Sequence, residues 1–240
     1  MTDCLHPIID DLEAVIFDLD GTLIDTVDLI RHTFQHTTKT LLGRDIPDDE
    51  LMAGVGCPLI VQMATFDAER AEELTDFYRT YQVGIHDDYV KEYPGVEEVL
   101  ADLHARKVPM AIVTSKSHDV ARKGLRLFDL NKYFDVLIGA DDVEIHKPDP
   151  YPLHVAAERL GVDIKRSIYI GDSPFDMRAA VGANSISVAA RWGAFDNGSV
   201  LEPRPTYAID DIRELLDLID CDAEKYRVDY TEFEAPAPCE

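Results

Sequence analysis

The stretch "AVIFDLDGTLIDT", residues 14–26, leads an apolar run directly into two aspartates and then into Gly-Thr. The run at 13–18 is continuous rather than alternating, which is the pattern of a strand buried on both faces. Asp18 and Asp20 are separated by one residue, so in an extended chain their side chains lie on the same side. This stretch therefore predicts a buried strand that delivers two carboxylates to one edge of a sheet.

Four more β-rich runs follow, and each ends in a polar cluster. They cover residues 108–115, 134–141, 167–172 and 185–190. Between them, apolar residues recur at three- and four-residue steps, which is the period of a helix that packs against a sheet. Strands that alternate with helices predict an α/β fold, in which a parallel sheet is covered by helices.

One long segment, residues 25–92, departs from this alternation. It holds no strand candidate of any strength, only helical patterns separated by polar segments. These patterns cover residues 29–42, 59–66 and 71–83. We therefore predict a helical subdomain at 25–92, inserted into a core formed by residues 1–24 and 93–220. Residues 221–240 are polar, acidic and contain Pro, so we expect a loosely held acidic tail there.

The charge of the chain restricts its partners. With 47 acidic and 23 basic residues, the formal net charge is −24. Such a chain repels nucleic-acid phosphates and anionic membranes, so we expect neither as a partner. The acids are spread along the whole chain, and our preferred interpretation is a protein of a halophilic cytoplasm; an acidic mesophilic enzyme is the alternative.

The cysteines indicate the compartment. Cys4, Cys57, Cys221 and Cys239 show neither CxxC pairs nor a metal-ligand spacing, which indicates free thiols in a reducing compartment. No apolar run approaches the roughly 18 residues of a membrane span. The N-terminus also lacks the basic-then-apolar layout of a signal peptide. We therefore expect a soluble, cytoplasmic protein.

Polar side chains follow four of the five predicted strands, close to the point where each strand ends. They are Asp18 and Asp20 after the first, Thr114 and Ser115 at the second, Lys147 after the third, and Asp172 and Asp176 after the fourth. In an α/β sheet, ligands gather at the carboxyl ends of the strands. The sequence therefore predicts carboxylates, a hydroxyl and an ammonium at one edge.

Clustered carboxylates repel one another unless a cation lies among them. Oxygen ligands on a tight turn suit Mg²⁺, which binds through one or two carboxylates and keeps waters and substrate phosphate. We expect Asp18 and Asp172 to be these ligands. A carboxylate beside a metal, with Lys147 and Thr114 available to hold oxygens, is what phosphoryl transfer through an aspartyl phosphate requires. Asp20 is then placed to act first as an acid and then as a base.

These residues resemble the four motifs of the haloacid dehalogenase superfamily of phosphatases, and the resemblance covers nearly the whole chain. The matching residues are Asp18, Asp20 and Thr22 in the first motif (D-x-D-x-T), Thr114 in the second (a Ser or Thr that ends a strand), Lys147 in the third (a Lys, commonly followed by Pro), and Asp172 and Asp176 in the acidic fourth (G-D-x-x-x-D). Each motif alone is weak. All four in order, each at a strand end, are a specific signal.

The resemblance implies a Rossmann-like core with a helical cap inserted after the first motif, which agrees with the helical segment at 25–92. It implies that Asp18 is the nucleophile and that Asp20 is the general acid and base. It also implies that Mg²⁺ is held by the Asp18 carboxylate, the backbone carbonyl of Asp20 and Asp172.

The remaining assignments concern the substrate. The resemblance implies that Thr114 and Lys147 bind the transferring phosphoryl group, and that Asp176 supports the metal shell or Lys147. We expect further substrate contacts from two residues beside the motifs, Thr22 and Ser115, and from two in the cap loop "GVGCPL", Gly54 and Gly56. An ordinary turn between helices is the alternative for that loop.

The resemblance implies hydrolysis of a small phosphorylated metabolite. We expect a monomer or a homodimer. The segment 78–100 is most similar to the branch of phosphoglycolate phosphatases and inorganic pyrophosphatases. Phosphoglycolate, or a similar small phosphorylated acid, is therefore our first candidate substrate, and pyrophosphate is the second.

Three other functions have less support. The family's sugar-phosphate mutases carry a cap histidine about a dozen residues past the nucleophile, where this chain has Ile30, with His32 nearby. A metal-independent 2-haloacid dehalogenase ranks below the mutase, because that branch generally lacks the second aspartate of the first motif, which is Asp20 here. A binding module on an inactive hydrolase fold would have lost a motif residue, and none is lost.

Overall fold

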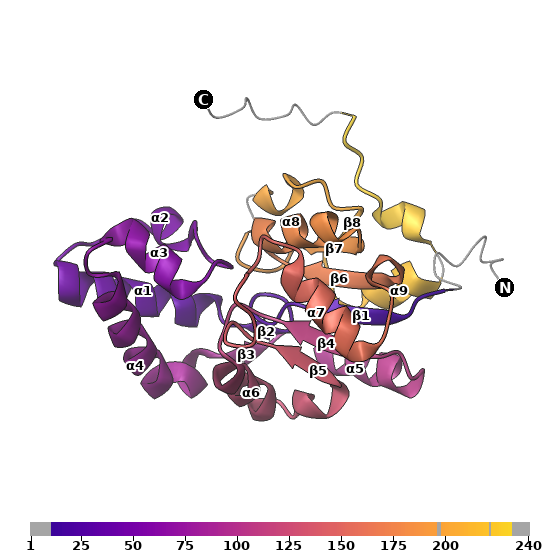
Figure 1. The fold of residues 1–240 in the computed structure, drawn as a ribbon, viewed down its shortest axis with the longest axis horizontal. Coiled ribbons are helices and arrows are strands. Elements are labelled where there is room, and N and C mark those ends of the chain that lie inside the picture. The colour runs from indigo at the N-terminus through magenta and orange to yellow at the C-terminus, as the bar shows by residue number, and fades with distance from the viewer. Residues whose placement is uncertain (1–10, 196–197, 221, 232–240) are drawn as a thin grey trace.

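A six-stranded parallel sheet forms the centre of the molecule (Figure 1). The computed structural model describes residues 11–195, 198–220 and 222–231. In spatial order the strands are β5 (Val136–Ile138), β4 (Met110–Val113), β1 (Ala14–Phe17), β6 (Ser167–Gly171), β7 (Ile186–Ala190) and β8 (Tyr207–Ile209). β1 lies between β4 and β6 and pairs in parallel with both. The predicted α/β fold with a helix-covered parallel sheet is confirmed.

Burial on both faces explains the continuous apolar runs. All four residues of β1 are buried, and successive side chains point to opposite faces of the sheet. Val15 and Phe17 pack in one core cluster, whereas Ile16 packs in the other. Each face is covered by helices, so neither leaves room for the polar residues of an alternating strand.

The helices of the core divide between the two faces. α5 (Val96–Ala105), α6 (His118–Leu127) and α9 (Glu214–Asp220) bury their apolar residues in the same cluster as Val15. α7 (Tyr151–Leu160) and α8 (Pro174–Ala183) bury theirs with Ile16. Four short 3₁₀ helices complete these layers, at Leu130–Tyr133, Ile164–Arg166, Ser199–Leu201 and Ala223–Tyr226.

The segment between β1 and α5 forms a group of helices beside the sheet (Figure 1). It consists of α1 (Val27–Leu42), α2 (Asp48–Met52), α3 (Leu59–Phe66) and α4 (Ala71–Tyr89). These helices share a core of their own, centred on Phe34, Leu51, Met63 and Leu74. We call residues 25–92 the insert below.

A short antiparallel ribbon, which the sequence analysis did not predict, joins the insert to the core. It pairs β2 (Ile24–Asp25) with β3 (Lys91–Glu92). Both residues of β3 are exposed, so the strand has no apolar run that would indicate it. β8 was also missed, because its three residues are flanked by polar ones, whereas β5, of the same length, lies within the longer run at 134–141.

Part of the expected tail packs on the core instead. Ala223 and Tyr226 are buried against it, and Arg227 forms a β-bridge with Tyr207. The expectation of a loose tail from residue 221 onward is therefore wrong for residues 222–231. Residues 221 and 232–240 lie outside the described part of the chain. Among the described residues, no helix combines the length and apolar character that a membrane crossing needs.

Candidate active site

Three strands deliver a polar side chain to the same edge of the sheet. Asp18, Thr114 and Asp172 each follow directly on the last residue of β1, β4 and β6. Because these strands are parallel neighbours, the three side chains lie close together. All three are almost completely buried, with exposed fractions of 6%, 5% and 3%.

Lys147 reaches this edge from the loop that follows β5. Its Nζ donates to Asp18 Oδ1 at 2.8 Å and to Asp176 Oδ1 at 2.6 Å. It also donates to the hydroxyl of Tyr169 at 3.2 Å. Burial opposes the charged ammonium, but the two carboxylates outweigh it and raise the pKa of Lys147 above its usual value. Lys147 is therefore a charged, fully paired cation inside the site.

Asp176 has both carboxylate oxygens occupied by the protein. It lies in the first turn of α8, where Ser173 and Asp176 cap the helix reciprocally. Its Oδ2 accepts from the backbone N–H and the hydroxyl of Ser173, and its Oδ1 accepts from Lys147 and Tyr169. This arrangement fixes the position of Lys147 and leaves Asp176 little capacity for another ligand.

Asp172 lies in a narrow space between two backbone segments. Its Oδ2 accepts a hydrogen bond from the backbone N–H of Ala194 at 2.6 Å. A Cβ on Gly21 would lie 2.2 Å from this oxygen, and one on Gly193 would lie 2.1 Å from it. Gly21 also has a left-handed φ of +76°, which favours glycine. The two glycines therefore allow the backbone to approach this carboxylate.

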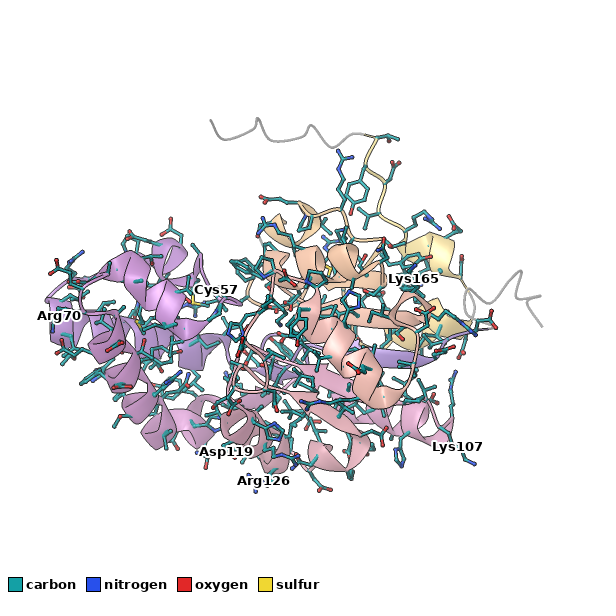
Figure 2. The ribbon with its side chains drawn as sticks, viewed as in Figure 1. Cys57, Arg70, Lys107, Asp119, Arg126 and Lys165 are labelled. Carbon is teal, nitrogen blue, oxygen red and sulfur yellow. The ribbon has the colours of Figure 1, made fainter. Side chains whose placement is uncertain are left out.

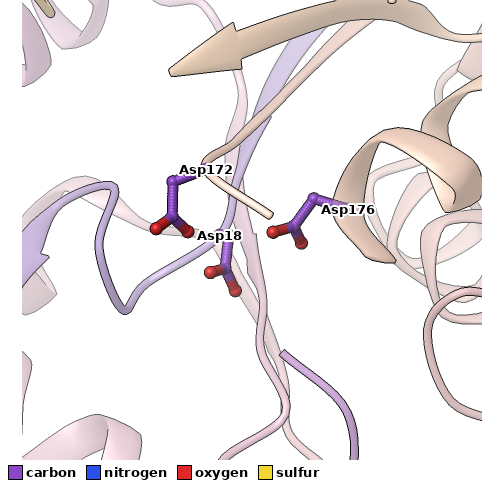
Figure 3. A group of neighbouring side chains, drawn as sticks. All are labelled: Asp18, Asp172 and Asp176. Carbon is purple, nitrogen blue, oxygen red and sulfur yellow. The ribbon is translucent and has the colours of Figure 1, made fainter. Parts of the chain in front are cut away.

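The site contains more buried negative charge than its one ammonium balances. Asp18, Asp172 and Asp176 converge on one spot, with one oxygen from each within 4.8 Å of the others (Figure 3). Burial, and then the charge of Asp176, raise the pKa of Asp18 to about 7. Burial, Asp176 and Asp18 together raise the pKa of Asp172 well above its usual range. A cation among these carboxylates would offset both effects.

Two oxygens are available for such a cation. Asp18 Oδ2 and Asp172 Oδ1 accept no hydrogen bond from any described residue, whereas the other oxygen of each carboxylate does. Buried carboxylate oxygens are ligands of the kind that a hard divalent cation prefers. The donor set thus fits a metal ion between β1 and β6.

Asp20 lies beyond the end of β1 and is half-buried. Its Oδ1 accepts from the Thr26 hydroxyl at 2.6 Å and from Nζ of Lys116. Lys116 was not singled out in the sequence analysis, although it comes two residues after Thr114 at a strand end. Tyr169, which bonds both Lys147 and Asp176, was also missed, because an aromatic residue inside a buried strand gives no polar signal.

A cavity of about 370 Å³ lies between this edge and the insert. The core lines it with Asp18, Asp20, Thr114, Ser115, Lys116, Lys147, Asp172 and Ser173, among others. Cys57, which also lines it, lies on the side of the insert toward the sheet, whereas Arg70 lies at the far end (Figure 2). Cys57 is the one cysteine among the described residues, and it is a free thiol.

The structure brings some of the expected substrate contacts to this cavity and leaves others outside. Gly56 and Ser115 both line it, and the Ser115 hydroxyl donates to the carbonyl of Gly56 at 2.7 Å. Gly54 is not among the lining residues and packs against Gln62. Thr22 is also absent from the lining, and its buried hydroxyl has no hydrogen-bond partner among the described residues.

Ile30 and His32 lie in different surroundings. Ile30 lines the cavity. The His32 ring bonds the hydroxyl of Tyr81 at 2.9 Å and stacks on Tyr89, with ring centroids 4.9 Å apart, and it does not line the cavity. Within the described residues, no histidine from the insert lines this cavity.

Comparison with known proteins identifies the family. The model of the haloacid dehalogenase-like hydrolases matches residues 15–190. A PpaX protein from Caldanaerobacter subterraneus subsp. tengcongensis is 39% identical over 90% of this chain and 98% of its own length. Pyrophosphatase PpaX from Halalkalibacterium halodurans is 35% identical over 87% of this chain and 97% of its own.

Solved structures share the fold. A predicted phosphoglycolate phosphatase from Haemophilus somnus superposes with a TM-score of 0.77 at 22% identity, covering 86% of this chain and 97% of that one. β-Phosphoglucomutase from Clostridium difficile superposes with a TM-score of 0.73 at 21% identity, covering 85% and 93%. At these identities the likeness shows the fold alone. The sequence matches, however, show that this chain belongs to the haloacid dehalogenase-like hydrolases and, within them, to the phosphatases.

Proposed function

We propose that this protein is a Mg²⁺-dependent phosphatase that hydrolyses a small phosphorylated metabolite through an aspartyl phosphate on Asp18. One observation carries the proposal. Asp18 has one oxygen held by Lys147 and the other free, at the bottom of a cavity whose buried carboxylates outnumber their ammonium. A carboxylate held in this way is oriented for attack on a phosphorus atom above it.

Mg²⁺ would be held by Asp18, Asp172 and the backbone carbonyl of Asp20. The free oxygens of the two carboxylates support this ligand set, and the full hydrogen bonding of Asp176 supports a role for it in positioning Lys147 instead. When bound, the cation supplies positive charge that stabilises the charge on the transferring phosphoryl group.

In the first chemical step, a carboxylate oxygen of Asp18 forms a bond to phosphorus, and the bond from phosphorus to the leaving oxygen breaks. Asp20 donates a proton to that oxygen. Asp20 then takes a proton from water, whose oxygen attacks phosphorus and breaks the bond to Asp18, which releases inorganic phosphate. Thr114 and Lys147, which lie beside Asp18, hold the phosphoryl oxygens during both steps.

Phosphoglycolate, or a similarly small phosphorylated acid, remains our first candidate substrate. Pyrophosphate is the second, and the activity named for the PpaX relatives supports it. A mutase has less support, because Ile30 rather than a histidine faces the cavity from α1. A 2-haloacid dehalogenase has the least support, because that branch generally lacks the second aspartate of the first motif, which is Asp20 here and lines the cavity.

The test is a turnover panel with the purified protein in saturating Mg²⁺, using phosphoglycolate, pyrophosphate, a hexose phosphate, a nucleotide and an aryl phosphate. We expect kcat/KM to be highest for phosphoglycolate or pyrophosphate, and at least about tenfold lower for the nucleotide. EDTA should abolish turnover, and added Mg²⁺ should restore it. Full activity in EDTA, or turnover of a 2-haloacid alone, would contradict the proposal.

A further inference from the structure

The insert and the core contribute different chemistry to the cavity. The core side carries the acids and cations of the motifs. The insert side is largely apolar, with Ile30, Phe34, Val55, Leu59 and Val83 among its lining residues. Burial raises the pKa of the Cys57 thiol, so this side chain is neutral as well. Among the described residues that the insert contributes, Arg79 is the only charged one.

Arg79 also differs from the other cations of the cavity in its partners. Lys147 is paired with Asp18 and Asp176, and Lys116 is paired with Asp20. Arg79 forms no ion pair or hydrogen bond with any described residue. Several other arginines in the described part of the chain, such as Arg44, also lack an ion pair, but Arg79 is the one that lines the cavity, so its guanidinium is available to an anion there.

The position of Arg79 on α4 directs it toward the cavity. Tyr78 and Gln82, its neighbours on the helix, are buried, and both line the cavity together with Val83, four residues further on. Residues four apart lie on the same face of a helix. Arg79 and Val83 thus form the cavity-facing edge of α4, beside the buried face that packs in the core of the insert.

We propose that Arg79 binds an anionic group on the leaving portion of the substrate, and so selects compounds that carry negative charge at both ends. This inference rests on the phosphatase function proposed above. A guanidinium binds a carboxylate or a phosphate through two parallel hydrogen bonds, which makes it selective for such groups. The largely apolar insert side of the cavity suits a weakly polar connection between the two anions. The net charge of −24 repels anions generally, so a local cation is needed to hold the second one.

Two kinds of substrate supply such a group, a phosphorylated carboxylic acid and pyrophosphate. The experiment compares kcat/KM for phosphoglycolate, pyrophosphate and ethyl phosphate, which carries no second charge. The wild-type protein should prefer one of the two doubly anionic compounds over ethyl phosphate by at least about tenfold. Whichever compound is preferred identifies the source of the second anion.

Arg79→Met should remove this preference. We expect kcat/KM for the preferred compound to fall at least about tenfold, chiefly through KM, because the guanidinium would bind the leaving portion of the substrate and not the transferring phosphoryl group. For ethyl phosphate, kcat/KM should change less than about twofold. Arg79→Lys should retain part of the preference, and Arg79→Gln provides a second neutral variant if the methionine variant folds poorly. Arg44→Met is the matched control, because Arg44 is also an exposed arginine of the insert but does not line the cavity.

The outcomes separate the two proposals. If the wild-type protein hydrolyses no phosphate compound, the proposed function fails, and this inference fails with it. If it hydrolyses phosphate esters without preferring a doubly anionic one, the role of Arg79 alone is wrong. The role is also wrong if Arg79→Met lowers kcat/KM equally for all three compounds, or if Arg44→Met has the same effect.

Discussion

At the residue scale, the site depends on the Asp18 carboxylate, whose two oxygens have different surroundings. Asp18 Oδ1 is fixed by Lys147, and Lys147 is fixed in turn by Asp176 and Tyr169. The free Oδ2 shares the site with Asp172. A substitution of Asp18 therefore affects both the nucleophile and the metal ligand.

Asp18→Asn should lower hydrolysis by several orders of magnitude for every substrate, because the amide is a poor nucleophile and a poor metal ligand. Asp20→Asn should affect substrates with poor leaving groups most, since these need a proton in the first step. Steady-state kinetics on an aryl and an alkyl phosphate will distinguish the two variants. An Asp18→Asn protein with near wild-type turnover would disprove covalent catalysis.

The raised pKa of Asp18 predicts how metal binding depends on pH. In the metal-free protein the folded state holds the Asp18 proton more tightly than the unfolded state does. The protonated Asp18 carboxyl therefore contributes to the stability of the folded state fully below about pH 4, and this contribution is lost as the pH rises through about 7. The loss amounts to at most about 4 kcal/mol. Mg²⁺ binds the carboxylate form, so its affinity should rise over the same range.

Thermal unfolding with and without Mg²⁺ measures this effect. We expect the increase in Tm on adding Mg²⁺ to be larger at pH 8 than at pH 5.5. Asp18→Asn is the control. In EDTA, the wild-type protein should lose stability from pH 5.5 to pH 8 as Asp18 ionises, and the variant, which lacks this buried charge, should not. The Tm of the variant relative to that of the wild type should therefore rise over this range. A Mg²⁺ effect that is equal at both pH values, or larger at pH 5.5, would contradict the prediction.

The glycines around Asp172 allow a test of why glycine is needed there. It separates the strain of a left-handed backbone from a steric clash with the Asp172 carboxylate. Gly21→Ala should weaken Mg²⁺ binding at least about tenfold, because the new Cβ displaces the Asp172 carboxylate. Gly43→Ala is the matched control, since Gly43 has a similar φ of +63° but nothing within 4 Å of the added Cβ. The control should lose about 1–2 kcal/mol of stability and bind Mg²⁺ normally. Calorimetric titration with Mg²⁺ provides the comparison, and equal weakening in both variants would rule out the collision.

At the element scale, the placement of the site follows from the parallel sheet. Sequence patterns alone predicted five of the six strands of the sheet. The polar residues that follow β1, β4 and β6 lie together because these strands are parallel neighbours. Lys116 and Tyr169 were missed because their roles come from contacts across elements, with Asp20 in one case and with Lys147 and Asp176 in the other. Gly54 and Thr22 are close in sequence to site residues but do not line the cavity, because closeness in sequence does not decide which way a turn faces.

The loop between α2 and α3 contacts the core through one hydrogen bond, from the Ser115 hydroxyl to the Gly56 carbonyl. Ser115→Ala should raise KM about two- to tenfold with little change in kcat, because the substrate must then order a loop that the core no longer holds. Ser117→Ala is the control, since Ser117 also lines the cavity but its hydroxyl makes no such bond. Equal KM values for the two variants would show that this contact does not help to order the site.

At the scale of the whole molecule, the net charge of −24 is the dominant feature. Most of the ion pairs are exposed, as for Lys39 with Asp45, and such pairs contribute little. The remaining like charges repel one another, and salt screens that repulsion. If the charge reflects a halophilic habitat, Tm should rise by roughly 5 °C or more between 0.1 and 2 M KCl. Sucrose is the control, because it stabilises folded proteins without screening charges. A Tm that is flat or falls in KCl would favour the acidic mesophilic interpretation.

The ribbon of β2 and β3 has a consequence for how this protein can be altered. The chain enters the insert through β2 and leaves it through β3, and the two residues of each strand are paired side by side. A change in the insert between these two strands therefore need not disturb the register of the six-stranded sheet. For the same reason the insert is an exchangeable module. A different helical unit can replace residues 30–89, while Thr26, which bonds Asp20, and Leu29 and Val90, which pack in the core cluster of the sheet, stay in place.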